Sequence, residues 1–203
     1  SYGKLMKAYY AKQDAEKLSG KGDTSQKLTL MKTSADSLKK SADALNDSSL
    51  WEKKKIKKKD EKTGEEIAVE DYDWDKITKA VKSFVEDYND VVKEAGESNT
   101  KDVLRNASWM TGMTDKNSNM LAKIGITIGK GNKLELDEDA LKQADISSLK
   151  TVFTGYNSFV SKISQKATGI SNAANRASAT YTNNGTYSKT DSSLTSSKID
   201  KEV

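Results

Sequence analysis

The stretch Leu121–Ala144, LAKIGITIGKGNKLELDEDALKQA, changes its hydrophobic pattern three times and decides the fold of the chain. It begins as the end of a helix and then alternates between apolar and other residues, as a half-buried β-strand does. The run Gly129–Asn132 interrupts the alternation with residues that tolerate a positive φ. The alternating residues are Ile124, Ile126, Ile128, Leu134 and Leu136. The pattern therefore predicts a β-hairpin over about residues 124–136.

The acidic residues after this hairpin are typical of a helix start. Asp137 stands at the N-cap position, and Glu138 and Asp139 fall in the first turn, where the helix dipole favours anions. A second acidic group, Asp71, Asp73 and Asp75, also precedes a predicted helix. Neither group matches the twelve-residue calcium loop. We expect the acids to cap helices, and we predict no metal site and no cofactor.

The composition favours an elongated helical protein with a narrow core over a compact enzyme. Of the 203 residues, only 34% are apolar and 32% are charged, and the chain has no proline to interrupt a helix. It has neither cysteine nor histidine, which removes thiol chemistry and the commonest general base, so we predict no enzyme activity. The mild net charge of +4 does not indicate nucleic acid, and no window is apolar enough for a membrane span.

Long helices with heptad spacing surround the opening stretch. Residues 1–19 form one expected helix, and residues 24–45 form a second. Residues 77–92 form a third, and residues 149–177 are expected to form the longest one. The apolar positions of each helix form one narrow stripe, or seam. In the second helix the seam is Leu28, Met31, Ala35, Leu38, Ala42 and Leu45. In the third it is Ile77, Val81, Phe84, Tyr88 and Val91, and in the last it includes Tyr156 and Lys166. A further helix is expected after a Ser98–Thr100 cap. Such narrow seams bury well only against other helices.

A basic run, Lys53–Lys59, breaks the helical pattern between the second and third helices. A turn signal at Lys62–Gly64 and an acidic run follow, which predicts a second hairpin over about residues 51–72. One register places Lys54 opposite Glu70 and Lys58 opposite Glu66. The run could instead bind an anionic surface, but an exposed hairpin with its own counter-charges explains it better.

Seven apolar residues are candidate contacts with a partner: Trp51, Ile56, Tyr72, Trp74, Trp109, Met110 and Met113. Aromatic residues and methionines are frequent at interfaces. The alternative for the tryptophans that bracket the charged hairpin is that they pack its base onto the bundle. The alternative for the cluster around Trp109 is that it fills an irregular gap in the core.

Four motifs, in order, resemble bacterial flagellar hook-associated proteins, most closely the filament-capping (hook-associated protein 2) family. The segment Phe84–Val92, FVEDYNDVV, is similar to a family helix motif. The opening stretch is similar to a family signature through Ile124-Gly-Ile126, Asn132-Lys-Leu134 and Leu136–Leu141. The segment Val152–Gly155 and the segment that begins at Gly185 resemble later family motifs.

This resemblance implies a secreted, self-assembling structural protein of the bacterial flagellum, outside the cell. Its expected partners are further copies of itself, flagellin or other hook-associated proteins. Where the family carries large β domains between its first helices, this chain has only the hairpin at 51–72. An extracellular adhesive or glycan-binding module derived from such a scaffold is the alternative. Residues 1–180 are expected to form one elongated helical domain, with a polar, partly flexible tail at 181–203.

Overall fold

The computed structural model describes residues 22–60 and 62–180. The expected helix over residues 1–19, the tail over 181–203 and the motif at Gly185 lie outside the described residues. Within them, the chain is mainly α-helical with two small antiparallel hairpins, as the sequence predicts.

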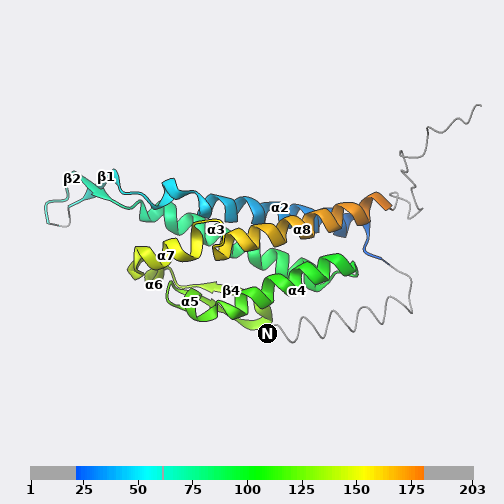
Figure 1. Cartoon of the computed structure of the whole chain (residues 1–203). Coiled ribbons are helices and arrows are strands. Elements are labelled where there is room, and N and C mark those ends of the chain that lie inside the picture. The colour runs from blue at the N-terminus through cyan, green and yellow to red at the C-terminus, as the bar shows by residue number, and fades with distance from the viewer. Residues whose placement is uncertain (1–21, 61, 181–203) are drawn as a thin grey trace, which may run out of the picture.

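Four long helices within residues 22–180 form an elongated antiparallel bundle. They are α2 (Ser25–Asn46), α3 (Trp74–Gly96), α4 (Lys101–Lys116) and α8 (Phe159–Thr180). Helix α2 packs against both α3 and α8, and α4 packs against α8 and α3. Successive helices run in alternating directions along the long axis of the molecule (Figure 1). The small β-structure and the short helices lie at one end of α4.

The predicted seams form the core. Every apolar position of the seam in α2 is buried, and so are all five seam positions of α3. Ala35, Ala42 and other small residues occupy the core beside large ones such as Phe84, which keeps the helices close together. Burying a large aliphatic or aromatic side chain contributes about 1.5–3 kcal/mol, so these stripes supply most of the driving force for folding.

Hydrogen bonds fix how α2 lies along α8. Asp36 accepts a hydrogen bond from Ser171 Oγ, and Asp43 accepts one from Ser164 Oγ, both at 2.6 Å. The two aspartates are seven residues apart on α2, and the two serines are seven residues apart on α8. This equal spacing in opposite directions sets the antiparallel register of the two helices, because a heptad returns a side chain to the same face.

The stretch that opened the sequence analysis forms the crossover between α4 and α8. It comprises α5 (Ser118–Ala122), β3 (Ile126–Ile128), the short 3-10 turn η2 (Lys130–Asn132), β4 (Leu134–Leu136) and α6 (Glu138–Gln143). The turn takes positive φ at Gly131 (74°) and Asn132 (63°), as predicted. Asp137 caps α6 by accepting hydrogen bonds from the N–H groups of Asp139 and Ala140.

Gly125 allows β3 to approach the start of α6. Its φ is +81°, and a Cβ placed there would lie 2.6 Å from the carbonyl oxygen of Asp137. The Asp137 N–H in turn donates to the Gly125 carbonyl at 2.8 Å. Only glycine fits both the left-handed backbone and this close approach.

The charged hairpin forms as predicted, but its register is one residue away from the expected one. After the 3-10 helix η1 (Ser48–Trp51), β1 (Lys54–Lys59) pairs with β2 (Glu66–Asp71), and Lys54 lies opposite Asp71, not Glu70. The Asp60 carboxylate accepts from the N–H groups of Lys62 and Thr63, and Gly64, with φ +73°, donates to the Asp60 carbonyl. This turn joins Asp60 to Glu65 with an even number of residues between them, whereas the predicted register needed an odd number.

The predicted last helix is interrupted. Helix α7 (Ile146–Phe153) ends before α8 begins, because Gly155 adopts φ +99° and Thr154 is extended. The Gly155 N–H donates to Asn46 Oδ1 at 2.8 Å, which ties the break to the end of α2. Tyr156 was expected in the seam but is 83% exposed in the break.

The segment that leads into α4 is held by a residue far away in sequence. Thr100 is at the N-cap position but makes no side-chain cap, contrary to expectation. Instead the buried Asp23 carboxylate accepts hydrogen bonds from Ser98 Oγ, the N–H groups of Asn99 and Thr100, and Thr100 Oγ1. Burial alone would raise the pKa of Asp23, but these hydrogen bonds and the nearby Lys27 ammonium hold it below the ordinary value.

Candidate assembly surfaces

The residues that carry the family resemblance meet inside the molecule. Tyr88 is fully buried on α3 and donates its hydroxyl hydrogen to Thr114 Oγ1 at 2.9 Å. Burial raises the pKa of this phenol well above its ordinary value. The neighbouring Asn89 pairs with the backbone of Leu134 in β4: Nδ2 donates to the carbonyl at 2.9 Å, and Oδ1 accepts from the N–H at 2.7 Å. The motif in α3 therefore holds the hairpin of the opening stretch.

Two of the seven candidate contact residues are in the core. Trp51 is fully buried, stacks on Phe153 with ring centroids 5.4 Å apart, and donates Nε1–H to the Leu45 carbonyl at 2.8 Å. Met110 is fully buried as well. These two side chains cannot contact a partner in this structure, because both are fully buried.

The other candidate residues reach the surface to different degrees. Tyr72 and Trp74 are half-buried, and their rings meet edge to face at the base of the charged hairpin. Met113 is half-buried on α4. Trp109 on α4 is 63% exposed and carries the Lys166 ammonium 4.7 Å above its ring, a cation–π contact between α4 and α8. Trp109 is thus the most exposed aromatic side chain among the seven.

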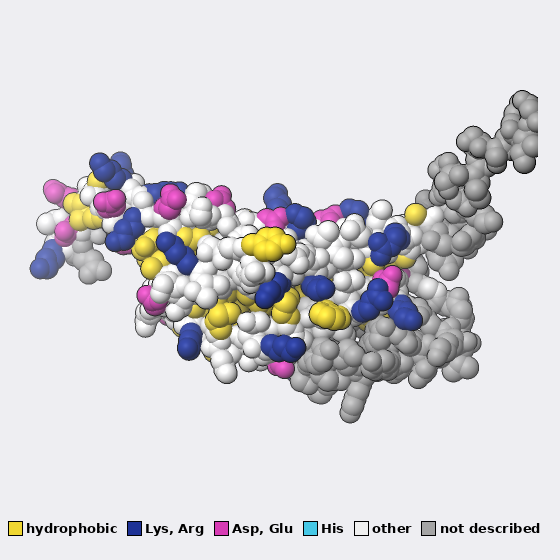
Figure 2. Space-filling model, viewed as in Figure 1, with side chains coloured by type: hydrophobic (Ala, Val, Ile, Leu, Met, Phe, Trp, Pro, Cys, Tyr) yellow, Lys and Arg dark blue, Asp and Glu magenta, His cyan; other side chains and the backbone are white. Residues whose placement is uncertain are grey.

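The charged hairpin, which we call the arm (residues 54–71), extends beyond the end of the bundle (Figure 1). Ile56, the seventh candidate, lies opposite Val69 on one face of the arm, with the 41% exposed Ile67 beside them. Ile56 and Val69 are not part of the buried core cluster. Figure 2 shows apolar side chains on the arm among basic and acidic ones. Side chains of all three kinds are therefore available to a partner there.

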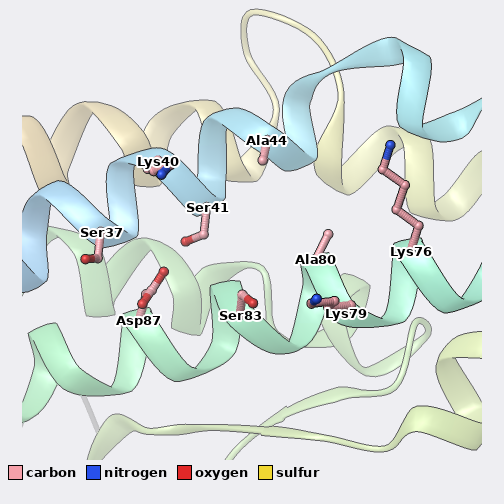
Figure 3. A pocket seen from close by; sticks show the side chains of 9 residues that line it. All are labelled: Ser37, Lys40, Ser41, Ala44, Lys76, Lys79, Ala80, Ser83 and Asp87. Carbon is pink, nitrogen blue, oxygen red and sulfur yellow. The ribbon is translucent and has the colours of Figure 1, made fainter.

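A groove of about 390 Å³ runs between α2 and α3 on the outside of the bundle. Small side chains such as Ser41 and Ala80 line it, with Lys40, Lys76 and Lys79 around it (Figure 3). Asp87 points into the groove toward Ser41 (Figure 3). Burial, together with the nearby acidic side chains of Asp90 and Glu86, raises the pKa of the Asp87 carboxyl despite a hydrogen bond with Ser41.

Acidic residues from both of the candidate metal-binding groups accept hydrogen bonds from backbone N–H groups at the start of a helix. Asp73 accepts from the Lys76 N–H at the start of α3, as Asp137 does for α6. Among the residues that the structure describes, no cluster of three or more acids could hold a metal ion. Over the same residues, no helix is long and apolar enough to cross a membrane.

A model of a known protein family matches half of the chain. The matching family model is described as the flagellar hook-associated protein 2 C-terminus, and it spans residues 98–202. Those residues include α4, the crossover with both strands of the small hairpin, and α8. No curated protein and no solved structure matches the chain. The chain therefore belongs to the family of flagellar hook-associated protein 2, through that protein's C-terminal region.

Proposed function

We propose that this chain is a self-assembling structural subunit at the outer end of the bacterial flagellum. It acts there by packing against flagellin and other hook-associated proteins, and it carries out no chemical reaction. The family match over residues 98–202 is the observation that carries this proposal. An elongated bundle whose narrow seams are already filled leaves outward surfaces, such as the α2–α3 groove and Trp109, for neighbouring subunits.

The proposal predicts binding at filament ends. Purified full chain should bind filaments assembled from the flagellin of the bacterium that encodes it, and gold-labelled antibody should mark one end of each filament in electron micrographs. Deleting the gene should release unassembled flagellin into the medium. A strictly monomeric chain that binds neither flagellin nor any hook component would refute the proposal.

Trp109 allows surface contact to be separated from folding. Trp109→Ala removes an exposed ring, so we expect weaker binding to filament ends with little change in the free energy of unfolding. Trp51→Ala is the matched tryptophan variant in the core and should lower stability instead. Equal binding by wild type and Trp109→Ala would remove Trp109 from the contact surface.

One of the three aromatic residues on which the adhesive alternative depends is not accessible to a glycan. Glycan stacking needs an exposed ring, and Trp51 is fully buried against Phe153. Tyr72 and Trp74 lie against each other at the base of the arm and are half-buried. We therefore propose the assembly function alone.

A further inference from the structure

The arm has two free edges of opposite charge. Among the residues that the structure describes, it is a sheet of only two strands, so each strand has one unpaired edge. Strand β1 has the sequence KKIKKK, with five lysines and no acid, and β2 has the sequence EIAVED, with three acids and no basic residue. Two strands alone form a marginally stable sheet in water, and further pairing would stabilise it.

The backbone alternation shows which residues face outward at each edge. The Asp60 N–H donates to the Glu65 carbonyl at 2.9 Å, so the next pair, Lys59 and Glu66, does not exchange hydrogen bonds within the arm. The same holds for every second pair along the ladder. At the two edges, the N–H and C=O groups that point away from the partner strand therefore belong to Lys55, Lys57 and Lys59 on β1 and to Glu66, Ala68 and Glu70 on β2.

Much of the charge on the arm is not neutralised within it. Lys57 pairs with Glu66 at 3.3 Å, and Lys58 pairs with Asp71 at 2.5 Å. Within the described part of the chain, Lys55, Lys59 and Glu70 form no ion pair. The side chains of Lys55 and Lys59 on the β1 edge and of Glu70 on the β2 edge can therefore pair with a partner of opposite charge.

We propose that the arm is a self-complementary joint, in which the β1 edge of one copy of this chain pairs with the β2 edge of the next. This inference rests on the self-assembly in the proposed function and says where neighbouring copies join. Two β1 edges would repel each other through their lysines, and two β2 edges would repel each other through their acids. Charges on an edge strand commonly prevent pairing with other chains. Here they prevent pairing between two identical edges and leave pairing of β1 with β2 possible. The allowed pairing of unlike edges has a direction.

Such a joint fits arms that point the same way in successive subunits. Because β1 and β2 run in opposite directions, β1 of one copy and β2 of a similarly oriented neighbour are antiparallel. The result is a continuous antiparallel sheet in which each arm adds two strands. Without stagger, Lys55 lies opposite Glu70 of the next copy, and Lys59 lies opposite Glu66. A head-to-tail contact of this kind closes into a ring or continues as a helix.

The first test reverses the charge of one edge. Lys55→Glu with Lys59→Glu changes neither lysine that forms an ion pair within the arm. Sedimentation velocity of the full chain over a concentration series, at low salt, measures self-association. We expect the dissociation constant between copies to rise roughly tenfold or more, since two facing pairs become repulsive. Unchanged self-association would overturn the proposal.

A variant with the charges of the two edges exchanged controls for the possibility that the first variant only unfolds the arm. Adding Glu66→Lys and Glu70→Lys to the first variant restores opposite charges across the arm and across the joint, with the net charge of the wild type. This exchanged chain should again associate with itself to within roughly threefold of wild type. It should not form mixed assemblies with wild type, which fluorescence energy transfer between labelled copies would detect. Mixed assembly at the wild-type level would contradict the proposed joint.

A backbone variant tests edge pairing independently of charge. Ala68→Pro removes an N–H that points out of the β2 edge and leaves the ladder within the arm intact. We expect weakened self-association with unchanged helical circular dichroism. The matched charge control is Lys130→Glu with Lys133→Glu, two exposed lysines in the turn of the crossover. If that control weakens self-association as strongly as the edge reversal, the effect is one of overall charge and the arm proposal fails.

The outcomes separate this inference from the proposed function. If the chain binds filament ends and self-associates, but neither the edge reversal nor Ala68→Pro alters that association, only the arm joint is refuted. If the wild-type chain neither self-associates nor binds any axial protein, the proposed function itself is refuted.

Discussion

Replacing Asp23 should reveal how strongly the start of α2 is held to the start of α4. The buried carboxylate accepts hydrogen bonds from Ser98 Oγ at 2.7 Å, from the Asn99 and Thr100 N–H groups at 2.9 Å, and from Thr100 Oγ1 at 2.6 Å. These donors come from a segment about 75 residues further along the chain. In Asp23→Asn, the shape stays the same, but one acceptor oxygen becomes a donor that faces other donors.

The expected loss follows from this geometry. Hydrogen bonds to a charged group contribute about 1.5–3 kcal/mol each, but bonds that share one carboxylate are not additive. Losing the charge and mismatching one oxygen should therefore cost about 3 kcal/mol in the free energy of unfolding at pH 7. With a urea m-value of about 2–3 kcal/mol/M, the midpoint should fall by roughly 1–1.5 M.

The loss should depend on pH in a direction set by the pKa of Asp23. That pKa is lower in the folded chain than in the unfolded one. The carboxylate thus contributes stability that is fully present above the unfolded value of about 4 and that disappears as the pH falls through the folded value. The stability gap between wild type and Asp23→Asn should be constant from about pH 5 to 8 and should shrink below about pH 4.

Urea unfolding followed by circular dichroism, at protein concentrations low enough to keep the chain monomeric, measures this gap. Asp115→Asn, an exposed aspartate on α4, is the matched control and should change stability by less than about 0.5 kcal/mol. A gap below about 0.5 kcal/mol at pH 7, or one that stays the same down to about pH 2.5, would refute the role assigned to Asp23.

Three further substitutions test the interior of the bundle by the same unfolding assay. Gly125→Ala should cost about 2 kcal/mol or more, because φ is +81° and the new methyl group would meet the Asp137 carbonyl; a neutral result would show that the crossover can shift. Asn89→Ala should cost about 1–3 kcal/mol, because both backbone groups of Leu134 lose their partner, and hydrogen exchange should rise at β4; equal protection of β4 in both proteins would contradict the assigned bond. Trp51→Phe should cost about 1–3 kcal/mol through the lost indole hydrogen bond and the smaller ring, and unaltered stability would contradict its place in the core.

Local periodicity was enough to predict most of the helical framework. The seams of α2 and α3 follow from three-four spacing, because each seam residue needs only a neighbouring helix to be buried. The caps at Asp73 and Asp137 were predictable for the same reason, since each accepts hydrogen bonds from residues within the next turn. Both hairpins could be placed from alternation and turn residues.

Features that depend on distant residues or on details of a turn were not predictable. The sequence favoured a Ser98–Thr100 cap, and Asp23 gave no signal because its partners are about 75 residues away. The register of the arm depends on whether its turn holds an even or an odd number of residues, which Asp60 and Gly64 decide together. The heptad stripe continued through Gly155, although the backbone there turns away to meet Asn46.

The same distinction bears on where the proposed joint lies. Tyr88 and Asn89, which carry the resemblance in α3, are used inside the molecule to hold Thr114 and the hairpin, and Gly125 is used to bring β3 close to α6. In this chain the polar side chains of Tyr88 and Asn89 are used for contacts within the bundle. The proposed joint lies in a part of the chain that those motifs do not include: of the described residues, the arm extends beyond the end of the bundle (Figure 1). Its opposite edges supply both charge and unpaired backbone groups, which gives a joint its direction as well as its attraction.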